Sequence, residues 1–394
     1  MRKRILCVDF GYTLNIAGGG VRVMSDMSNA FIERGYECSF ICSDIGEENL
    51  FFPVHPKVKF INLGRSNVTL FKKIKRETLR AMHMLNSEKM NNEIYHDKSI
   101  KEKLLLNIKN ISPDIIFSYD FQSLASLESL KKKINVPVIS MIHTGAKYIF
   151  NDNFSDFHRK VYDYPDVIQV LTESDVSIVK KFVNKNNIIY IPNPVNAPES
   201  YIKDHSKCNK VIINIGRIIK SSKQQLMLVK AFNLIKDDFP NWKIELWGGF
   251  YSKAQELYKM EIEEYCKKNS LQNRVMFMGE THNVYEKIQR ADICAFSSKK
   301  EGFALGLAEA MALGLPAIGY RSCSGVNSII QDEFNGFLVD DGIEDFASKL
   351  RILMADSNLR KRMGENAYES MKRFRPEKIW DQWEDVITRI LKNN

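Results

Sequence analysis

Short apolar runs alternate with segments of helical spacing along most of this chain. Such continuous runs predict strands buried on both faces, as in a parallel sheet. The predicted strands are residues 4–8, 37–42, 114–118, 138–142, 166–171 and 188–191 in the first half, and 211–215, 243–247, 274–278, 292–296 and 335–339 in the second half. Their alternation with helical segments predicts an α/β fold with parallel sheets.

The opening of the chain has the order strand, glycine-rich loop, helix, strand. The strand 4–8 is followed by Gly18-Gly19-Gly20 and then by a helix that reaches about Arg34. Glycines at the first turn are typical of nucleotide-binding α/β folds. The loop lacks the spacing G-x-G-x-x-G, so we do not predict a nicotinamide or flavin site.

The chain of 394 residues is long enough for two domains, each with its own core. Residues 45–110 are rich in lysine and asparagine and predict no clear order of elements, although helical periodicity persists there. The polar, patternless stretch 196–209 predicts a linker between the domains.

The N-terminus and the cysteines indicate the compartment. The first apolar run is too short for a secretory signal and ends at Asp9, and no run of about 18 apolar residues predicts a membrane span. The seven cysteines are scattered without a C-x-x-C pair, which is typical of free thiols in a reducing compartment. We therefore expect a cytoplasmic protein.

The formal net charge of +9 is concentrated between residues 65 and 109. The cations there are Lys72, Lys73, Lys75, Arg76, Arg80, Lys101, Lys103 and Lys109, with Phe71, Leu79, Met82 and Leu85 between them. This basic amphipathic pattern predicts peripheral contact with an anionic membrane, at the inner face of the plasma membrane, or with a lipid-phosphate acceptor. Solubility alone is the alternative. No nucleic-acid motif accompanies the charge, so nucleic acid is not expected as a partner.

The stretch with the clearest chemistry is S-S-K-K-E-G-F-A-L-G-L-A-E-A-M-A-L-G-L-P-A-I-G, residues 297–319. It predicts a turn at Gly302, where a side chain would block a close backbone approach, and a helix that begins near Ala304 and ends before Gly314 and Pro316. The open amides from Phe303 to Leu305 predict an anion site.

Two carboxylates flank this predicted anion site. Glu301 and Glu309 are eight positions apart, close to two helical turns, so both side chains can point to the same side. A phosphate site beside carboxylates that accept from hydroxyl groups suits a nucleotide-sugar. A purely structural helix with surface glutamates is the alternative.

These residues resemble the Glu-x7-Glu signature of retaining glycosyltransferases of the GT-B type, in family 4, where members often read E-G-F-G-L-x-x-x-E-A-M-A-x-G-x-P-V-I. This chain departs at Ala304, where the family often has Gly or Ser. The resemblance implies two Rossmann-like doubly wound domains that face an interdomain cleft. It implies an acceptor-binding domain at 1–197, completed by a C-terminal helix at 377–394, and a donor-binding domain at 208–376.

A second segment, G-R-I-I-K-S-S-K from Gly216, resembles the family pattern G-R-x-x-x-x-K with one residue inserted. The resemblance implies that Arg217 and a lysine hold the diphosphate, Arg217 with a planar fork and the lysine with a compact charge. Because of the insertion, either Lys220 or Lys223 could correspond to the family's lysine. We choose Lys223, because K-Q-Q-L-M-L matches the helix that follows the family's lysine. Further along, Gly279 and Asn283 resemble G-x-x-x-N-V and imply backbone contacts to the base.

The first domain contributes two further matches. Gly18 and Gly19 match the family's Gly-Gly loop near the reacting centre, with a plain flexible loop as the alternative. His143 follows the strand 138–142 directly, at the end of a strand where α/β proteins place ligands. The resemblance implies that His143 contacts the donor sugar.

The resemblance implies an enzyme that moves a sugar from a nucleotide-sugar, UDP being favoured, to a hydroxyl acceptor that is lipid-linked or a glycan. It implies retention of the anomeric configuration and a role in bacterial surface polysaccharide, glycolipid or glycoconjugate synthesis. Glu301, His143, Arg217 and Lys223 would act at the reacting centre, and Glu309 would hold the ribose. No D-x-D cluster is present, so we expect a metal-independent reaction without a cofactor. The alternatives are a nucleotide-sugar 2-epimerase and a non-catalytic nucleotide-sugar binding subunit.

Overall fold

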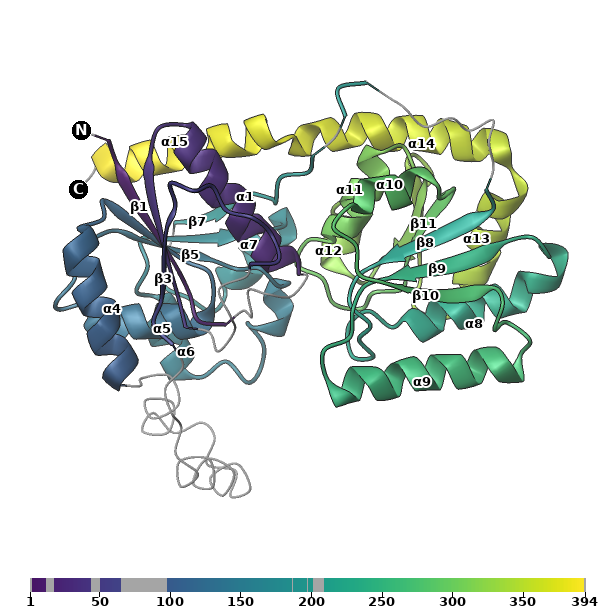
Figure 1. The fold of residues 1–394 in the computed structure, drawn as a ribbon, viewed down its shortest axis with the longest axis horizontal. Helices are drawn as coiled ribbons and strands as arrows, with labels where there is room; N and C mark the ends of the chain where they lie inside the picture. The colour runs from purple at the N-terminus through teal and green to yellow at the C-terminus, as the bar shows by residue number, and fades with distance from the viewer. Residues whose placement is uncertain are drawn as a thin grey trace, which may run out of the picture. The chain divides into compact units, whose positions relative to one another are not determined.

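The structure is a computed structural model that describes residues 2–11, 18–43, 50–64, 98–185, 187–196, 198–200 and 209–392. The chain divides into two compact units. The first unit comprises Met1–Ile191 and Trp380–Asn394, and the second comprises Pro192–Ile379. Figure 1 shows one sheet flanked by helices in each unit.

The first unit contains a parallel sheet in the order β3-β2-β1-β4-β5-β6-β7. Its strands are β1 (Arg4–Asp9), β2 (Glu37–Cys42), β3 (Lys59–Asn62), β4 (Ile115–Ser118), β5 (Val138–Met141), β6 (Val167–Val170) and β7 (Ile188–Tyr190). Its helices and turns are α1 (Gly19–Glu33), α4 (Lys98–Ile111), α5 (Phe121–Leu130), Ala146–Tyr148, α6 (Asp156–Tyr162), α7 (Glu173–Val179) and most of α15 (Pro376–Lys392). The prediction of a parallel α/β sheet is confirmed.

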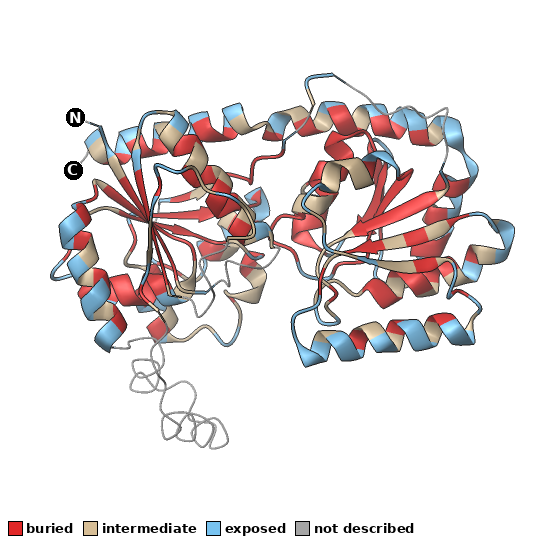
Figure 2. Ribbon diagram, in the orientation of Figure 1, coloured by how far each residue is buried: buried red, intermediate tan, exposed pale blue. Residues whose placement is uncertain are grey.

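Alternate residues of each strand pack against opposite faces of this sheet. Leu6 and Val8 of β1 join a core with α4 and α5, whereas Phe117 of β4 contacts α1 and α15 on the other face. The strands β1, β2, β4, β5 and β6 are buried almost throughout, whereas β3 and β7 at the edges of the sheet are not (Figure 2). This two-sided burial explains why the strands could be predicted from apolar runs.

Helix α15 returns the end of the chain to the first unit, as the resemblance implied. Trp380 packs against Phe31 of α1, and Trp383 packs edge-on against Phe117 with ring centroids 5.4 Å apart. Arg34, after α1, pairs with Asp381 at 2.8 Å. The first unit is therefore discontinuous in sequence.

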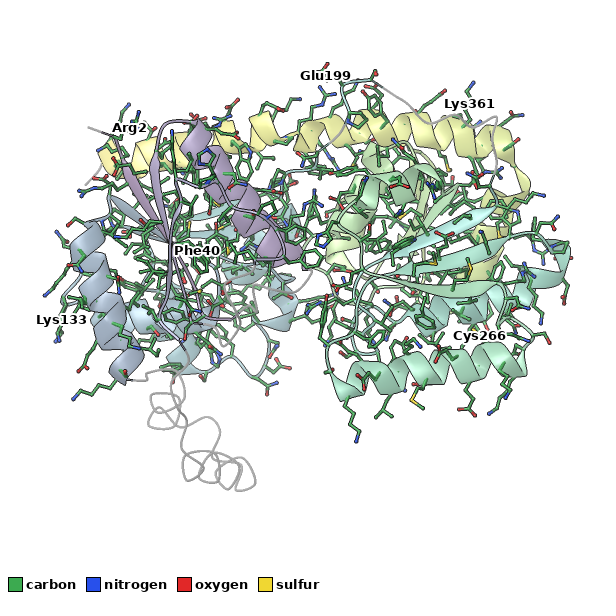
Figure 3. The ribbon with its side chains drawn as sticks, in the orientation of Figure 1. Arg2, Phe40, Lys133, Glu199, Cys266 and Lys361 are labelled. Atoms are coloured by element: carbon green, nitrogen blue, oxygen red, sulfur yellow. The ribbon has the colours of Figure 1, made fainter. Side chains whose placement is uncertain are left out.

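The second unit contains a parallel sheet in the order β10-β9-β8-β11-β12-β13. Its strands are β8 (Val211–Ile215), β9 (Lys243–Trp247), β10 (Val275–Gly279), β11 (Ile293–Phe296), β12 (Ala317–Tyr320) and β13 (Gly336–Val339). Its helices and turns are α8 (Gln225–Ile235), Lys236–Asp238, α9 (Lys253–Lys268), α10 (Val284–Gln289), α11 (Leu305–Ala312), α12 (Ser324–Asn327), α13 (Glu344–Ala355), α14 (Ser357–Met371) and Lys372–Phe374. One core joins this sheet to α8, α9 and α13, and α9 contributes Tyr258, Ile262 and Cys266, the last of which is labelled in Figure 3.

The boundaries of the units differ from those predicted. The first unit ends at Ile191 instead of residue 197, and the second begins at Pro192 instead of residue 208. The return to the first unit comes at Trp380 instead of residue 377. The reason is hydrogen bonding: the amide of Val195 donates to the carbonyl of Phe374 at 2.8 Å, and Tyr368 donates to the carbonyl of Glu199 (labelled in Figure 3) at 2.7 Å. The linker therefore starts on the surface of the second unit.

Most of the predicted basic region, residues 65–97, lies outside the described residues. Of its cations, Lys101, Lys103 and Lys109 are described, and all three lie on α4. Among the described residues, no helix combines the length and apolar character that a membrane crossing requires.

Candidate active site

Two loops of the second unit meet at the carboxyl ends of the paired strands β8 and β11. Backbone and hydroxyl groups join them: the amide of Lys299 donates to the carbonyl of Ser222 at 2.7 Å, and the hydroxyl of Ser297 donates to the carbonyl of Gln224 at 2.9 Å. Gln224 takes a positive φ of 51°, which turns the first loop into α8. The two loops therefore form one framework, which we call the donor loops (216–224 and 297–304).

The side chains of Lys223 and Glu301 meet within this framework. Lys223 Nζ donates to Glu301 Oε1 at 2.5 Å, and the two side chains are only 20% and 8% exposed. Lys220 instead pairs with Glu261 of α9 at the surface, with 67% of its side chain exposed. The structure thus places Lys223, and not Lys220, beside the predicted carboxylate.

Gly325 of α12 fixes the backbone of Glu301. A Cβ at Gly325 would lie 2.7 Å from Glu301 Cβ and 2.8 Å from its carbonyl oxygen, so only glycine permits this approach. Sequence reasoning placed the close approach at Gly302, which is buried in the same turn. Gly325 was missed because its partner lies 24 positions away in the chain.

The predicted anion site at Phe303–Leu305 needs a correction. The amide of Ala304 donates to the carbonyl of Gly325 at 3.2 Å, and that of Leu305 donates to the carbonyl of Phe303 at 2.9 Å. Ala308 is the first residue of α11 whose amide donates back to Ala304. The amides at the N-terminus of α11 are therefore those of Gly306 and Leu307. They lie one and two residues after the last amide that was predicted, that of Leu305.

Glu309 lies on α11 and is 4% exposed. The hydroxyl of Tyr285, on α10, donates to Glu309 Oε1 at 3.4 Å. Sequence reasoning gave Glu309 a role but did not find Tyr285, because its contact to Glu309 depends on the packing of α10 against α11.

Arg217 lies two residues after the end of β8, and its backbone is held on both sides. The amide of Gly216 donates to Trp247 and that of Ile218 donates to Gly249, at 2.8 and 3.1 Å. Gly248 packs so tightly that a Cβ there would lie 2.2 Å from the carbonyl oxygen of Gly216. This contact fixes the point from which the partly buried Arg217 side chain leaves the sheet.

The predicted base-binding loop has a defined start and end. Gly279 ends β10 with a φ of 72°, and its carbonyl accepts from Gly248 at 2.8 Å. The side chain of Asn283 caps α10 by accepting from the amide of Glu286 at 3.2 Å. Asn283 therefore has a structural use, and the predicted backbone contacts to a base remain a prediction.

His143 follows β5 in the first unit and stacks on Tyr119, with ring centroids 5.4 Å apart and planes 10° apart. Burial lowers the pKa of His143 to about 4, because the charged imidazolium would lose its hydration. The loop after His143 is held where the amide of Ala146 donates to the buried carboxylate of Asp175 at 3.1 Å. His143 is therefore a neutral, oriented imidazole near pH 7.

Gly18 and Gly19 begin α1. Gly18 occupies the N-cap position in an extended conformation, and Gly19 is the exposed first residue of the helix. Among the described residues, no group of three or more His, Cys, Asp or Glu side chains is arranged to hold a metal ion.

Two family models match adjoining parts of the chain. The model described as Glycosyltransferase Family 4 matches residues 17–198, and the model described as Glycosyl transferases group 1 matches residues 199–370. The chain is 25% identical over 385 residues to an uncharacterized glycosyltransferase of Haemophilus influenzae. The matched residues cover 95% of this chain and 98% of that protein.

A second relative, from Campylobacter jejuni, is named GalNAc-alpha-(1->4)-GalNAc-alpha-(1->3)-diNAcBac-PP-undecaprenol alpha-1,4-N-acetyl-D-galactosaminyltransferase. It is 26% identical over 383 residues, which cover 96% of this chain and 97% of that protein. Among solved structures, a TarM mutant of S. aureus in complex with fondaparinux, alpha-GlcNAc-glycerol and UDP has a TM-score of 0.76 at 15% identity, covering 98% of this chain and 99% of that chain.

Two Rossmann-like parallel sheets and this structural likeness define the GT-B fold, which confirms the predicted fold class. The chain belongs to the family 4 glycosyltransferases, of group 1. It is a glycosyltransferase enzyme of polysaccharide or glycoconjugate synthesis, and neither predicted alternative, the epimerase or the non-catalytic subunit, is favoured.

Proposed function

We propose that this enzyme is a retaining glycosyltransferase that takes its sugar from a UDP-sugar. The observation that carries the proposal is the pairing of Lys223 with Glu301 inside the donor loops, next to the strand that presents Arg217. Cations and a carboxylate held together in this way suit a ligand that has both phosphate and hydroxyl groups.

In the proposed reaction, the nucleoside diphosphate departs with charge growing on its outer phosphate. Arg217, Lys223 and the leading amides of α11 would stabilise that charge, which is how fixed donors lower a barrier. Glu301 would accept from sugar hydroxyls, and Glu309 would accept from the ribose. The contact between His143 and the donor sugar concerns the other unit and stays a prediction.

Retention requires the acceptor to attack from the face that the diphosphate leaves. The family resemblance of Glu301-x7-Glu309 supports this course. The Campylobacter relative is named for an undecaprenol-linked glycan substrate. We propose an acceptor of the same general kind here, a hydroxyl on a lipid-linked glycan.

We also propose that the reaction needs no metal, because two protein cations would neutralise the diphosphate. Chelation with EDTA would then leave the initial rate unchanged, and restoration of a lost rate by Mg²⁺ or Mn²⁺ would contradict this part of the proposal.

Peripheral membrane contact through the basic region is the last part of the proposal. The cations of α4 support it, together with those at 72–80 that lie outside the described residues. Replacement of Lys72, Lys73, Lys75 and Arg76 by Gln should reduce co-sedimentation with vesicles that contain phosphatidylglycerol. Equal co-sedimentation of the wild type and the variant would contradict it.

The central experiment is a panel of UDP-, GDP- and ADP-sugars scored by nucleotide release with extracted lipid-linked acceptors. The proposal expects release from a UDP-sugar, and proton NMR of the glycoside should show the anomeric configuration of the donor. An inverted product, or release only from a GDP- or ADP-sugar, would contradict the corresponding part. Formation of an epimer from the donor alone would contradict transfer itself.

A further inference from the structure

The side chain of Gln225 closes the loop that carries the two proposed phosphate-binding cations. Gln225 is the first residue of α8, and its Nε2 donates to the main-chain carbonyl of Arg217 at 2.9 Å. The glutamine is completely buried. A buried carbonyl is costly to leave without a donor, so this bond is strongly favoured over arrangements of the loop that break it.

The bond from Gln225 completes a set of three around the backbone of Arg217. The amides of Gly216 and Ile218 donate to β9 and to the loop that follows it, as described above. The carbonyl of Arg217 lies between these two amides in the chain, and its donor comes from α8. The direction in which the Arg217 side chain leaves the backbone therefore depends on α8 as well as on β9.

The start of α8 is itself held by neighbouring elements. The amide of Leu226 donates to the hydroxyl of Tyr258, on α9, at 2.9 Å. The hydroxyl of Ser297 donates to the carbonyl of Gln224, which joins the same turn to the second donor loop. Gln225 lies between Gln224 and Leu226, so its side chain reaches Arg217 from a fixed backbone position.

The Lys223 ammonium lies beside the residue that precedes Arg217. A Cβ built on Gly216 would stand 3.5 Å from Lys223 Cε and 3.7 Å from Lys223 Nζ. Arg217 thus leaves the loop next to the place where the Lys223 head group packs. One loop, closed by Gln225, brings both cations to the same end of β8, and a diphosphate offers two anionic groups to such a pair.

We propose that Gln225 is a positioning residue that holds Arg217 and Lys223 in the mutual arrangement that grips a diphosphate, and that it thereby sets the preference of the enzyme for nucleoside diphosphates over monophosphates. This inference rests on the proposed phosphate role of the two cations and deepens it. Gln225 acts through the main chain of Arg217 and is itself too buried to touch a ligand. Binding groups whose arrangement is fixed in advance lose less free energy when they engage a ligand at two points.

The test compares the dissociation constants of UDP and UMP, measured by calorimetry with the full chain. The wild type should bind UDP at least about 10-fold more tightly than UMP. Gln225→Met removes the donor at similar volume and should reduce that ratio to below about 3-fold. Gln169→Met is the matched control in the first unit and should keep the wild-type ratio, because Gln169 is also buried and donates to a main-chain carbonyl, that of Val170, at 3.1 Å.

Arg217→Met and Lys223→Met separate the inference from the role on which it rests. If either of them lowers the ratio while Gln225→Met keeps it, the inference is overturned and the proposed phosphate role stands. If the wild type shows no preference for UDP, or if both cation variants retain it, the phosphate role is wrong and the inference fails with it.

Gln225→Leu is a second variant without a donor and should lower the ratio as Gln225→Met does. A wild-type ratio in either Gln225 variant would contradict the inference. Thermal unfolding of each variant allows the calorimetry to be done below its melting temperature, so that a lowered ratio does not reflect a folding defect.

Discussion

Lys223 and Glu301 form an ion pair at 2.5 Å between two side chains that are mostly buried. The same lysine is proposed to hold a phosphate, and the same glutamate a sugar hydroxyl. A nucleoside diphosphate bound at the proposed site would draw the Lys223 ammonium away from Glu301 and so compete with Glu301 for it. The pair would then set part of the cost of donor binding.

The first prediction is that Glu301→Gln tightens the binding of UDP by about 3- to 10-fold while it lowers turnover by about 100-fold or more. The variant removes the competitor for Lys223 but also removes a carboxylate from the sugar. Calorimetry measures the first effect, and nucleotide release from the UDP-sugar measures the second.

The control is the double variant with Lys223→Met. If competition for Lys223 is the cause, Glu301→Gln gives no tightening in the Lys223→Met background. Simple repulsion between Glu301 and phosphate would predict the same tightening in both backgrounds, and that result would contradict the competition.

The second prediction concerns the two candidate lysines. Lys223→Met should weaken UDP binding by about 10- to 100-fold, because a partly buried cation is lost from the phosphate site. Lys220→Met should change it by less than about 3-fold, because its exposed pair with Glu261 has little effect on the donor loops. A larger loss for Lys220→Met than for Lys223→Met, measured by calorimetry, would reverse the assignment.

The third prediction follows from the lowered pKa of His143. Between pH 6.5 and about 4, the unfolded chain takes up a proton at this histidine that the folded chain excludes, so stability falls as the pH falls through this range. The loss for the first unit should be on the order of 3 kcal/mol, and this histidine should cause none above pH 6.5.

Denaturant unfolding of the wild type and of His143→Asn at several pH values measures this difference. His143→Asn should flatten the curve below pH 6.5, whereas His282→Asn, an exposed histidine in the second unit, should keep the wild-type slope. Parallel curves for the wild type and His143→Asn would show that His143 titrates normally in the folded protein.

The fourth prediction compares two glycines with positive φ. Gly248→Ala should destabilise the second unit by on the order of 4 kcal/mol, because the new Cβ would collide with the backbone of Gly216. Gly279→Ala meets no atom within 4 Å and should cost only about 1 kcal/mol of backbone strain. Thermal unfolding measures both, and similar melting temperatures for the two variants would contradict the close contact at Gly248.

The sequence predicts the strands well because both faces of each sheet are covered, so that burial leaves uninterrupted apolar runs. It predicts neither β3, in which two residues are exposed and two are partly buried, nor β12 (Ala317–Tyr320), which is fully buried but follows α11 after a short turn. The choice of Lys223 over Lys220 came from the family resemblance, whereas the ion pair of Lys223 with Glu301 was not predicted. The contacts of Gly325 with Glu301 and of Tyr285 with Glu309 were not predicted either, because each joins elements that only tertiary packing brings together.

The start of α11 shows the same limit on a smaller scale. The local sequence predicted that α11 begins near Ala304, and the helix begins one residue later, at Leu305. The carbonyl of Gly325, from a different element, accepts from Ala304 and so decides which amides remain at the head of the helix. Capping by a distant backbone group has no sequence pattern of its own.

The hydrogen bonds from Val195 to Phe374 and from Tyr368 to Glu199 have a practical consequence for dissection of the enzyme. An excised donor-binding half that starts at residue 208 would lose both bonds and expose the carbonyl of Phe374. A fragment from Pro192 to Ile379 keeps the segment that contains Val195 and Glu199, and with it both hydrogen bonds. That longer piece is the one suited to expression alone and to titration with nucleotides.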